Sequence, residues 1–235
     1  DMDIKIPYTP RKHQAYLHRK IDKHRWNVLV CHRRFGKTVC MINHLIRSAL
    51  LSKLNNPRFA YIAPTFKQAK SIAWDYMKQF TAKIPHTKFN ETELRVDLPN
   101  GSRITLLGSE SPDGLRGIYL DGCVIDEYAN VNSKLFPEII RPALSDRKGY
   151  CVFIGTPMGM NNNFYELYQH AQSAEDWFNY KAKASDTKIV DQDELDKAKQ
   201  VMGEKKYMQE FECDWIANIE GSVYGDVIAK LDDDK

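Results

Sequence analysis

The residues with the clearest chemical potential form the run Cys31-His32-Arg33-Arg34-Phe35-Gly36-Lys37-Thr38. An apolar segment precedes this run and an amphipathic segment follows it, which predicts a strand, a loop and a helix in succession. In that context the loop N–H groups and the helix N-terminus can hold phosphate oxygens, while Lys37 neutralises them and Thr38 binds Mg²⁺. Cys31 replaces the first glycine of the usual phosphate-loop pattern. Taken alone, the run is equally consistent with a turn and an N-cap.

An acidic pair, Asp126-Glu127, follows the short apolar run Cys123–Ile125. At the carboxyl end of a strand, an aspartate can hold Mg²⁺ through water, and the next glutamate can orient and polarise an attacking water. In isolation such a pair is more simply an exposed cap. Downstream of a phosphate loop on the same sheet, it favours nucleotide hydrolysis with Mg²⁺ as the metal.

Three weaker signals accompany these motifs. Gly155-Thr156-Pro157 ends an apolar run, where a hydroxyl can sense a terminal phosphate or simply belong to a strand-ending turn. The segment Tyr8–Gln14 contains an amide, that of Gln14, which can read an adenine edge. The segment Pro64–Ala69 either contacts nucleic acid or begins an ordinary helix with Thr65 as its N-cap.

The hydrophobic pattern predicts the elements that position these motifs. Short apolar runs predict strands at 27–31, 58–63, 123–125 and 150–154, and a hairpin is predicted from 94–98 and 103–107 around Pro99-Asn100-Gly101-Ser102. Amphipathic patterns predict helices at 38–52 and 67–83. Strands that are apolar on both faces and alternate with helices predict an α/β fold with a mainly parallel sheet flanked by helices.

The pattern changes near residue 161. Beyond it, helices are predicted at 164–174, 193–202 and 205–211, around one strand at 178–182. We therefore predict a core domain over residues 1–160, a small, mostly helical subdomain over 161–220, and the start of a linker over 221–235.

Composition excludes several classes of protein. The chain has 235 residues, of which 43% are hydrophobic and 28% are charged, and it lacks an apolar run near the roughly 18 residues that a membrane helix needs. Membrane, disordered, collagen-like and coiled-coil classes are therefore excluded. The five cysteines stand singly, without metal-ligand spacing. We expect them to be reduced thiols, neither a disulfide framework nor a zinc site.

Positive charge is concentrated at the N-terminal end. Residues 1–60 contain 13 Lys/Arg and 3 Asp/Glu, although the whole chain has a net charge of only +3. Such a segment suits a polyanion, either nucleotide phosphates or nucleic acid, or else forms a solvated surface.

The motifs together resemble those of a known family. Arg33-Arg34-Phe35-Gly36-Lys37-Thr38, Val124-Ile125-Asp126-Glu127, Ile154-Gly155-Thr156-Pro157 and the early Pro10–Gln14 segment occur in the order and spacing of the large subunit of tailed-bacteriophage terminases. The resemblance extends from about Pro7 to Tyr224. In that family a phosphate loop without its first glycine, and with arginines before Gly-Lys-Thr, is characteristic.

The resemblance implies a P-loop NTPase of the additional-strand, catalytic-glutamate type with a lid subdomain, acting as the ATPase motor that packages DNA into procapsids. Family members usually continue into an RNase H-like nuclease domain, and residues 221–235 would begin the linker to it. Catalytic roles are implied for Lys37, Glu127, Arg33 and Arg116, Mg²⁺ binding for Thr38 and Asp126, and ATP binding for Arg11, Gln14, Arg33, Arg34, Phe35, Gly36, Lys37, Thr38 and Thr156.

Two of these roles reach beyond nucleotide binding. Thr156 would belong to the motif that couples hydrolysis to movement. Arg116, in the segment Asp113–Gly117, would act as an arginine finger in a neighbouring subunit's site, although an exposed loop arginine would give the same sequence pattern.

The implied partners are double-stranded DNA, a homo-oligomeric ring (a pentamer by resemblance), the portal protein and the small terminase subunit, with no membrane. The implied location is the cytoplasm of an infected bacterial host, docked on the procapsid. A helicase core is one alternative, although helicases normally carry two such domains in tandem. A non-hydrolysing DNA-binding assembly module is another, and the presence of both Lys37 and Glu127 argues against it.

Overall fold

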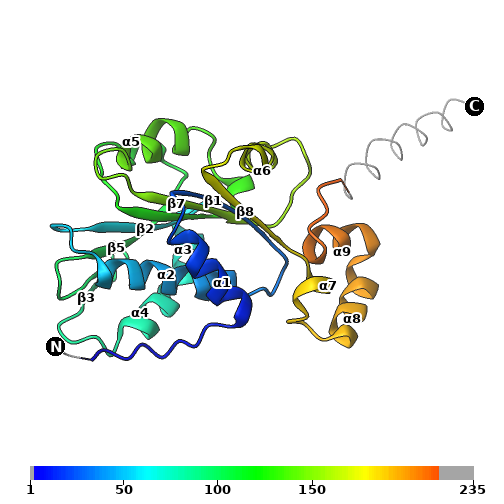
Figure 1. Ribbon diagram of the computed structural model, residues 1–235, viewed down its shortest axis with the longest axis horizontal. Helices are drawn as coiled ribbons and strands as arrows, with labels where there is room; N and C mark the ends of the chain where they lie inside the picture. The colour runs from blue at the N-terminus through cyan, green and yellow to red at the C-terminus, as the bar shows by residue number, and fades with distance from the viewer. Residues whose placement is uncertain (1–2, 217–235) are drawn as a thin grey trace, which may run out of the picture.

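The structure is a computed structural model and describes residues 3–216. Within that range, eight strands form one sheet with the order β3-β4-β5-β2-β6-β7-β1-β8 (Figure 1). They are β1 (Trp26–Cys31), β2 (Arg58–Ala63), β3 (Lys88–Asn90), β4 (Arg95–Asp97), β5 (Arg103–Gly108), β6 (Gly122–Asp126), β7 (Tyr150–Gly155) and β8 (Trp177–Ala182). The short and largely exposed β3 was not predicted, because it lacks an apolar pattern.

The sheet is mainly parallel. β5, β2, β6, β7, β1 and β8 pair in parallel, and β3 and β4 extend one edge through antiparallel pairing with β5. β7 lies between β1 and β6, so one additional strand separates the strand before the phosphate loop from the strand that ends in Asp126. The predicted fold class is confirmed, and so is the hairpin, whose turn contains Gly101 at φ +85°.

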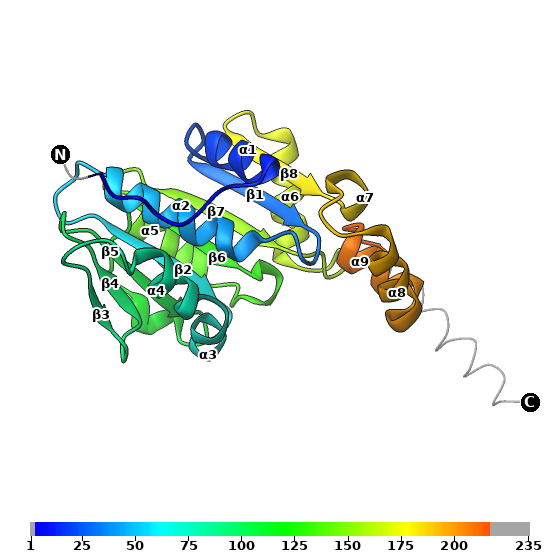
Figure 2. The same ribbon diagram turned by 90° about the horizontal axis from the view of Figure 1, so that it is seen from below.

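Helices cover both faces of the sheet (Figures 1 and 2). One face carries α1 (Lys12–Ile21), α2 (Lys37–Leu51), α3 (Phe66–Ala69) and α4 (Asp75–Thr81). The other carries the 3₁₀ turn Tyr128–Asn130, the π-helical turn Leu135–Ile140, α5 (Arg141–Ala143) and α6 (Asn163–Ser173), and a further 3₁₀ turn, Pro112–Leu115, precedes β6. Each face has its own hydrophobic core, because the central strands bury side chains on both sides.

The helix predicted at 67–83 is interrupted. A π-helical turn, Lys70–Trp74, joins α3 to α4. Ala73 and Trp74 at its end are buried, so the wider turn still presents an apolar face to the core. Such a turn leaves the apolar pattern nearly unchanged, and the sequence therefore indicates the helix but not its local widening.

A small group of helices lies beyond the carboxyl end of β8: α7 (Ala184–Thr187), α8 (Gln192–Met202) and α9 (Glu204–Phe211) (Figure 2). These helices share a separate small core that includes Leu195 and Phe211. β8, however, pairs with β1 in the main sheet, and α6 packs on that sheet. The division of the chain at residue 161 stays a prediction, and residues 217–235, including the whole predicted linker, lie outside the described part.

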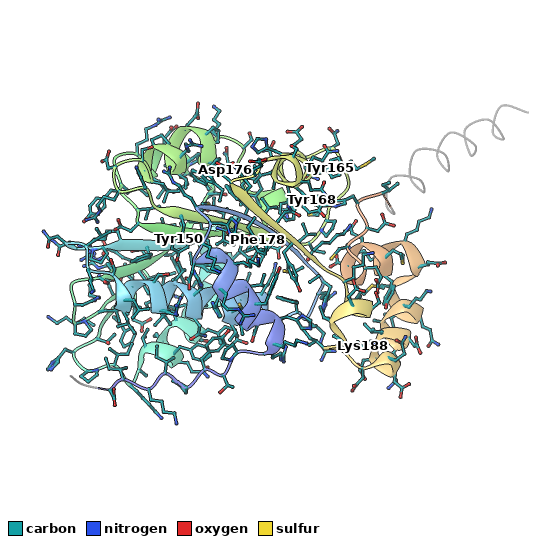
Figure 3. All side chains as sticks on the ribbon, viewed as in Figure 1. Tyr150, Tyr165, Tyr168, Asp176, Phe178 and Lys188 are labelled. Carbon is teal, nitrogen blue, oxygen red and sulfur yellow. The ribbon has the colours of Figure 1, made fainter. Side chains whose placement is uncertain are left out.

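Aromatic side chains connect the segment after α9 to the main body. The ring centroid of Trp215 lies 5.2 Å from that of Tyr165 and 5.5 Å from that of Tyr168. Both tyrosines belong to α6 (Figure 3). The segment that follows the small helices therefore returns to the sheet-covering helix α6.

The described part of the chain contains no helix long and apolar enough to span a membrane. All five cysteines are buried and free.

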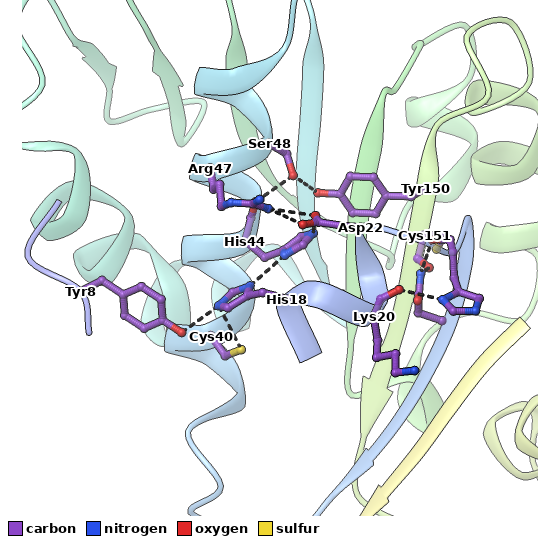
Figure 4. A network of polar contacts seen from close by, with 12 residues as sticks. Tyr8, His18, Lys20, Asp22, Cys40, His44, Arg47, Ser48, Tyr150 and Cys151 are labelled. Atoms are coloured by element: carbon purple, nitrogen blue, oxygen red, sulfur yellow. Dashed lines mark hydrogen bonds and ion pairs between the residues drawn. The ribbon is translucent and has the colours of Figure 1, made fainter. Parts of the chain in front are cut away.

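A pair of histidines, buried His44 and half-buried His18, joins the N-terminal segment, α1 and α2 (Figure 4). Nδ1 of His18 lies 2.9 Å from Nδ1 of His44, and the Tyr8 hydroxyl lies 2.9 Å from Nε2 of His18. Asp22 accepts two hydrogen bonds from Arg47, at 2.8 and 2.9 Å, beside the pair. His18, Asp22 and Arg47 also line a cavity of about 590 Å³ that the phosphate-loop residues do not share.

We expect acid to destabilise the fold through this pair. Burial and the nearby Arg47 lower the pKa of His18 to about 4, and burial, His18 and Arg47 lower the pKa of His44 to about 3. Because an unfolded histidine titrates near 6.5, the unfolded chain binds more protons below that pH. The free energy of unfolding should therefore fall by up to about 1.4 kcal/mol per pH unit for each histidine as the pH drops from 6.5 toward 4.

Urea unfolding between pH 7.5 and 4 measures this effect. The double variant His18→Gln, His44→Gln should lose this part of the pH dependence, whereas the control His170→Gln, at an exposed position, should retain it. Identical pH dependence in all three proteins would assign the effect to other groups.

Candidate nucleotide-binding site

A cavity of about 430 Å³ opens at the carboxyl edge of the parallel sheet. The strands β1, β6 and β7 all end at this edge. Among the described residues, four parts of the chain line the cavity. They are the loop and helix start 32–39, Ile72 and Tyr76 of the interrupted helix, the strand-end residues Glu127 and 156–158, and Lys206, Gln209 and Glu210 of α9.

The phosphate-loop run joins the buried strand β1 to α2, as predicted. Gly36, which precedes the first residue of α2, has a φ of +87°, a backbone conformation that residues other than glycine rarely adopt. A Cβ at this position would lie 3.2 Å from Nε2 of Gln14. Arg34 also has a positive φ, +67°. The first turn of α2 contains no acidic residue, so its N–H groups and positive helix end face the cavity without a neutralising carboxylate from the helix itself.

Lys37 lies between the two predicted acids. Its Nζ is 2.9 Å from Oδ1 of Asp126 and 2.5 Å from Oε1 of Glu127. Burial alone would lower the pKa of the Lys37 ammonium, but the two carboxylates outweigh burial and raise that pKa above its ordinary value. The site therefore holds a cation at the end of β6, where one ammonium pairs with two carboxylates.

Asp126 and Glu127 differ in environment although they are neighbours. Asp126 is 1% exposed and accepts a hydrogen bond from the buried Tyr61 hydroxyl. Glu127 faces the cavity, and its backbone N–H donates to Oδ1 of Asp126 at 2.8 Å. Its φ of +49° is unusual for glutamate, and such strain persists where the surroundings hold a residue in place, often at a functional site.

Thr156 connects β7 to the start of the phosphate loop. Its hydroxyl donates to the backbone oxygen of Cys31 at 3.2 Å, and the residue lines the cavity. A displacement at the end of β7 would therefore also move the start of the phosphate loop.

The helix α9 reaches the site from a distant part of the sequence. The N–H of Arg33 donates to the backbone oxygen of Glu210 in α9 at 2.7 Å. The neighbouring helix α7 also contacts the loop, because Nε2 of His32 lies 2.6 Å from the Thr187 hydroxyl. Lys206 and Glu210, which form an ion pair at 3.0 Å, both line the cavity. Sequence reasoning missed these residues and also Ile72, Tyr76 and Met158, because no local motif marks them.

The structure brings most of the predicted site residues to the cavity. Arg33 and Arg34 are exposed there, and buried Phe35 lines its wall. The others that line it are Gly36, Lys37, Thr38, Glu127 and Thr156, and Asp126 adjoins it through Lys37.

Besides Asp126, three predicted residues do not line this cavity, namely Arg11, Gln14 and Arg116. Gln14 is 4% exposed, donates to the Gly36 backbone oxygen at 3.2 Å, and accepts from the Arg11 N–H at 2.9 Å. Arg116 lies on the loop before β6 with its side chain 56% exposed, and it pairs with Asp113 at 3.0 Å. Adenine binding by Arg11 and Gln14, and the finger role of Arg116, stay predictions.

The donor set of this site fits a nucleotide phosphate with Mg²⁺. The helix N-terminus, Gly36 and Lys37 supply N–H and ammonium groups for phosphate oxygens. Thr38 and Asp126 supply hydroxyl and carboxylate oxygens, the ligand type that Mg²⁺ prefers, and Thr38 directly follows Lys37, whose ammonium contacts Asp126. The two oxygen donors are therefore close together.

Known proteins share this fold. The structure of the large terminase ATPase domain of Thermus phage P74-26 matches with a TM-score of 0.76 and 22% identity, covering 89% of this chain and 95% of that chain. The large terminase of another thermophilic bacteriophage, solved in complex with ADP, matches with a TM-score of 0.75 and 17% identity, covering 87% of this chain and 53% of that one.

Sequence comparison identifies the family. The terminase large subunit of Thermus phage G20c is 28% identical over 182 residues, which are 69% of this chain and 36% of the relative. The chain thus matches only about a third of the length of this curated relative. The family described as "Terminase large subunit, T4likevirus-type, N-terminal" matches residues 30–226. The chain belongs to this family of terminase large-subunit N-terminal domains.

Proposed function

We propose that this chain is a Mg²⁺-dependent ATPase that couples ATP hydrolysis to the translocation of double-stranded viral DNA during packaging. The observation that carries the proposal is the position of Lys37, which lies at the N-terminus of α2 and contacts both Asp126 and Glu127. Family membership supports it. Nucleotide binding is supported by the second structural match, the terminase of a thermophilic bacteriophage, which has been solved with ADP and with ATP-γ-S.

The residues divide the chemistry among them. The α2 N-terminus and Lys37 would hold the β- and γ-phosphates, and Thr38 and Asp126 would hold the metal. Mg²⁺, when bound, neutralises charge on the phosphate oxygens. Lys37 exchanges its contacts with the acids for contacts with phosphate, which leaves Glu127 free to accept a proton from the attacking water. Catalysis then rests on positioning and charge stabilisation, without a covalent intermediate.

The remaining proposals concern assembly. We propose a homo-oligomeric ring, a pentamer by family resemblance, that acts on double-stranded DNA with the portal protein and the small terminase subunit, in the cytoplasm of the infected host and docked on the procapsid. DNA contacts should be made to the phosphate backbone, because a motor must accept any sequence. DNA binding should therefore weaken steeply with salt.

ATP hydrolysis measured over a wide range of protein concentration tests the proposal. We expect phosphate release with Mg²⁺, none with EDTA, and a specific activity that rises with protein concentration because the complete site needs a neighbouring subunit. A specific activity that is independent of protein concentration would support the ATPase activity and contradict an active site shared between subunits. Tight ATP binding without hydrolysis at any concentration would favour the non-hydrolysing assembly module.

A further inference from the structure

Tyr61 lies in the middle of the sheet and its hydroxyl reaches the predicted metal site. It belongs to β2, whose neighbour β6 ends in Asp126, and Tyr61 is only 1% exposed. The hydroxyl donates a hydrogen bond to Oδ2 of Asp126. Because an ionised carboxylate can only accept hydrogen bonds, the Tyr61 hydroxyl is the donor in this contact.

This contact completes the set of donors around Asp126. Oδ1 accepts from the Glu127 N–H at 2.8 Å and from the Lys37 ammonium at 2.9 Å. Oδ2 accepts from Tyr61. Both carboxylate oxygens of Asp126 therefore accept hydrogen bonds. Of the three donors, only Tyr61 comes from β2, a strand that contributes no other residue to the site.

Thr38 lies near the same carboxylate. It directly follows Lys37, the first residue of α2, whose ammonium is 2.9 Å from Oδ1 of Asp126. The carboxylate that Tyr61 holds therefore lies at the helix start that carries the Thr38 hydroxyl.

We infer that Tyr61 is a positioning residue for Mg²⁺, which holds the Asp126 carboxylate in the orientation that a metal-bound nucleotide requires. This inference rests on the proposed nucleotide site. Tyr61 does not line the cavity among the described residues, so it acts through Asp126. Outer contacts of this kind typically change metal affinity by about 10- to 100-fold.

The variant Tyr61→Phe tests this role, because it removes the hydroxyl and keeps the ring. Tyr150→Phe is the matched control: Tyr150 is another largely buried tyrosine of the same sheet, on β7, and its hydroxyl lies 2.8 Å from the Ser48 hydroxyl (Figures 3 and 4). The readout is the affinity for a fluorescent ADP analogue, measured in EDTA and across a Mg²⁺ titration, in the full 235-residue chain.

We expect Tyr61→Phe to bind the analogue in EDTA as the parent does, and to need about 10-fold more Mg²⁺ to reach half of the metal-dependent gain in affinity. Tyr150→Phe should behave as the parent in both conditions. A parent-like Mg²⁺ titration of Tyr61→Phe overturns the inference and leaves the proposed function intact. A parent protein that binds no nucleotide, or binds it without a Mg²⁺ response, overturns both.

A second variant covers the case in which Tyr61→Phe does not fold, which thermal unfolding reports. Tyr61→Met also removes the hydroxyl, and it fills the buried position with an adaptable apolar side chain. It should show the same shift in the Mg²⁺ titration, and a parent-like titration would again overturn the inference.

Discussion

Replacement of Arg116 by alanine is expected to lower ATP hydrolysis by the assembled protein about 10³- to 10⁵-fold, the range that arginine fingers contribute. Arg116 is outside the cavity of its own chain and its side chain is 56% exposed on the loop before β6. A guanidinium so placed is available to a neighbouring subunit. Steady-state hydrolysis at a protein concentration that supports assembly measures the effect.

Two controls separate a shared site from a damaged loop. Asp113→Ala removes the ion-pair partner of Arg116 and leaves the guanidinium, so it should retain most of the activity. Mixing Arg116→Ala with Glu127→Gln protein should restore hydrolysis, because each Arg116→Ala subunit keeps its own Glu127 and can receive an arginine from its neighbour. Absence of any rescue, or full activity of Arg116→Ala alone, would contradict a finger in trans.

The substitution Glu127→Gln is expected to lower the rate of hydrolysis about 10²- to 10⁴-fold, the usual contribution of a positioned general base. Glu127 faces the cavity at the end of β6, and its carboxylate contacts Lys37. Glutamine keeps the shape and loses the capacity to accept a proton from water. Lys37 retains Asp126 as a partner, so ATP affinity should be preserved or increased.

Single-turnover hydrolysis together with equilibrium ATP binding distinguishes this outcome from a loss of binding. Glu110→Gln serves as the matched control, because Glu110 is an exposed carboxylate that accepts from the Phe66 N–H and does not line the cavity. It should hydrolyse ATP at the parent rate. A Glu127→Gln protein with parent-level turnover would require another base.

Whether a site residue could be predicted depends on how far apart in the sequence its contacts lie. The phosphate loop, the acidic pair and Thr156 were found because each follows directly on a buried apolar strand, and parallel strands bring their carboxyl ends to one edge of a sheet. The contacts of α9 with the loop were not predicted. Arg33 and Glu210 are joined by a hydrogen bond between backbone groups, which every residue has, so no side-chain pattern marks them. Tyr61 was read only as an apolar position in a strand, since its hydroxyl matters only when β2 lies beside β6.

The sequence by itself determined the fold class, the order of the motifs and the chemical types at the candidate site, because apolar periodicity and motif spacing are local properties of the chain. Only the tertiary structure decided which side chains meet. The strand order places Tyr61 against Asp126, the path of β8 carries α9 to the phosphate loop, and the loop before β6 leaves Arg116 outside its own cavity. These contacts depend on how distant segments pack, which no local pattern specifies.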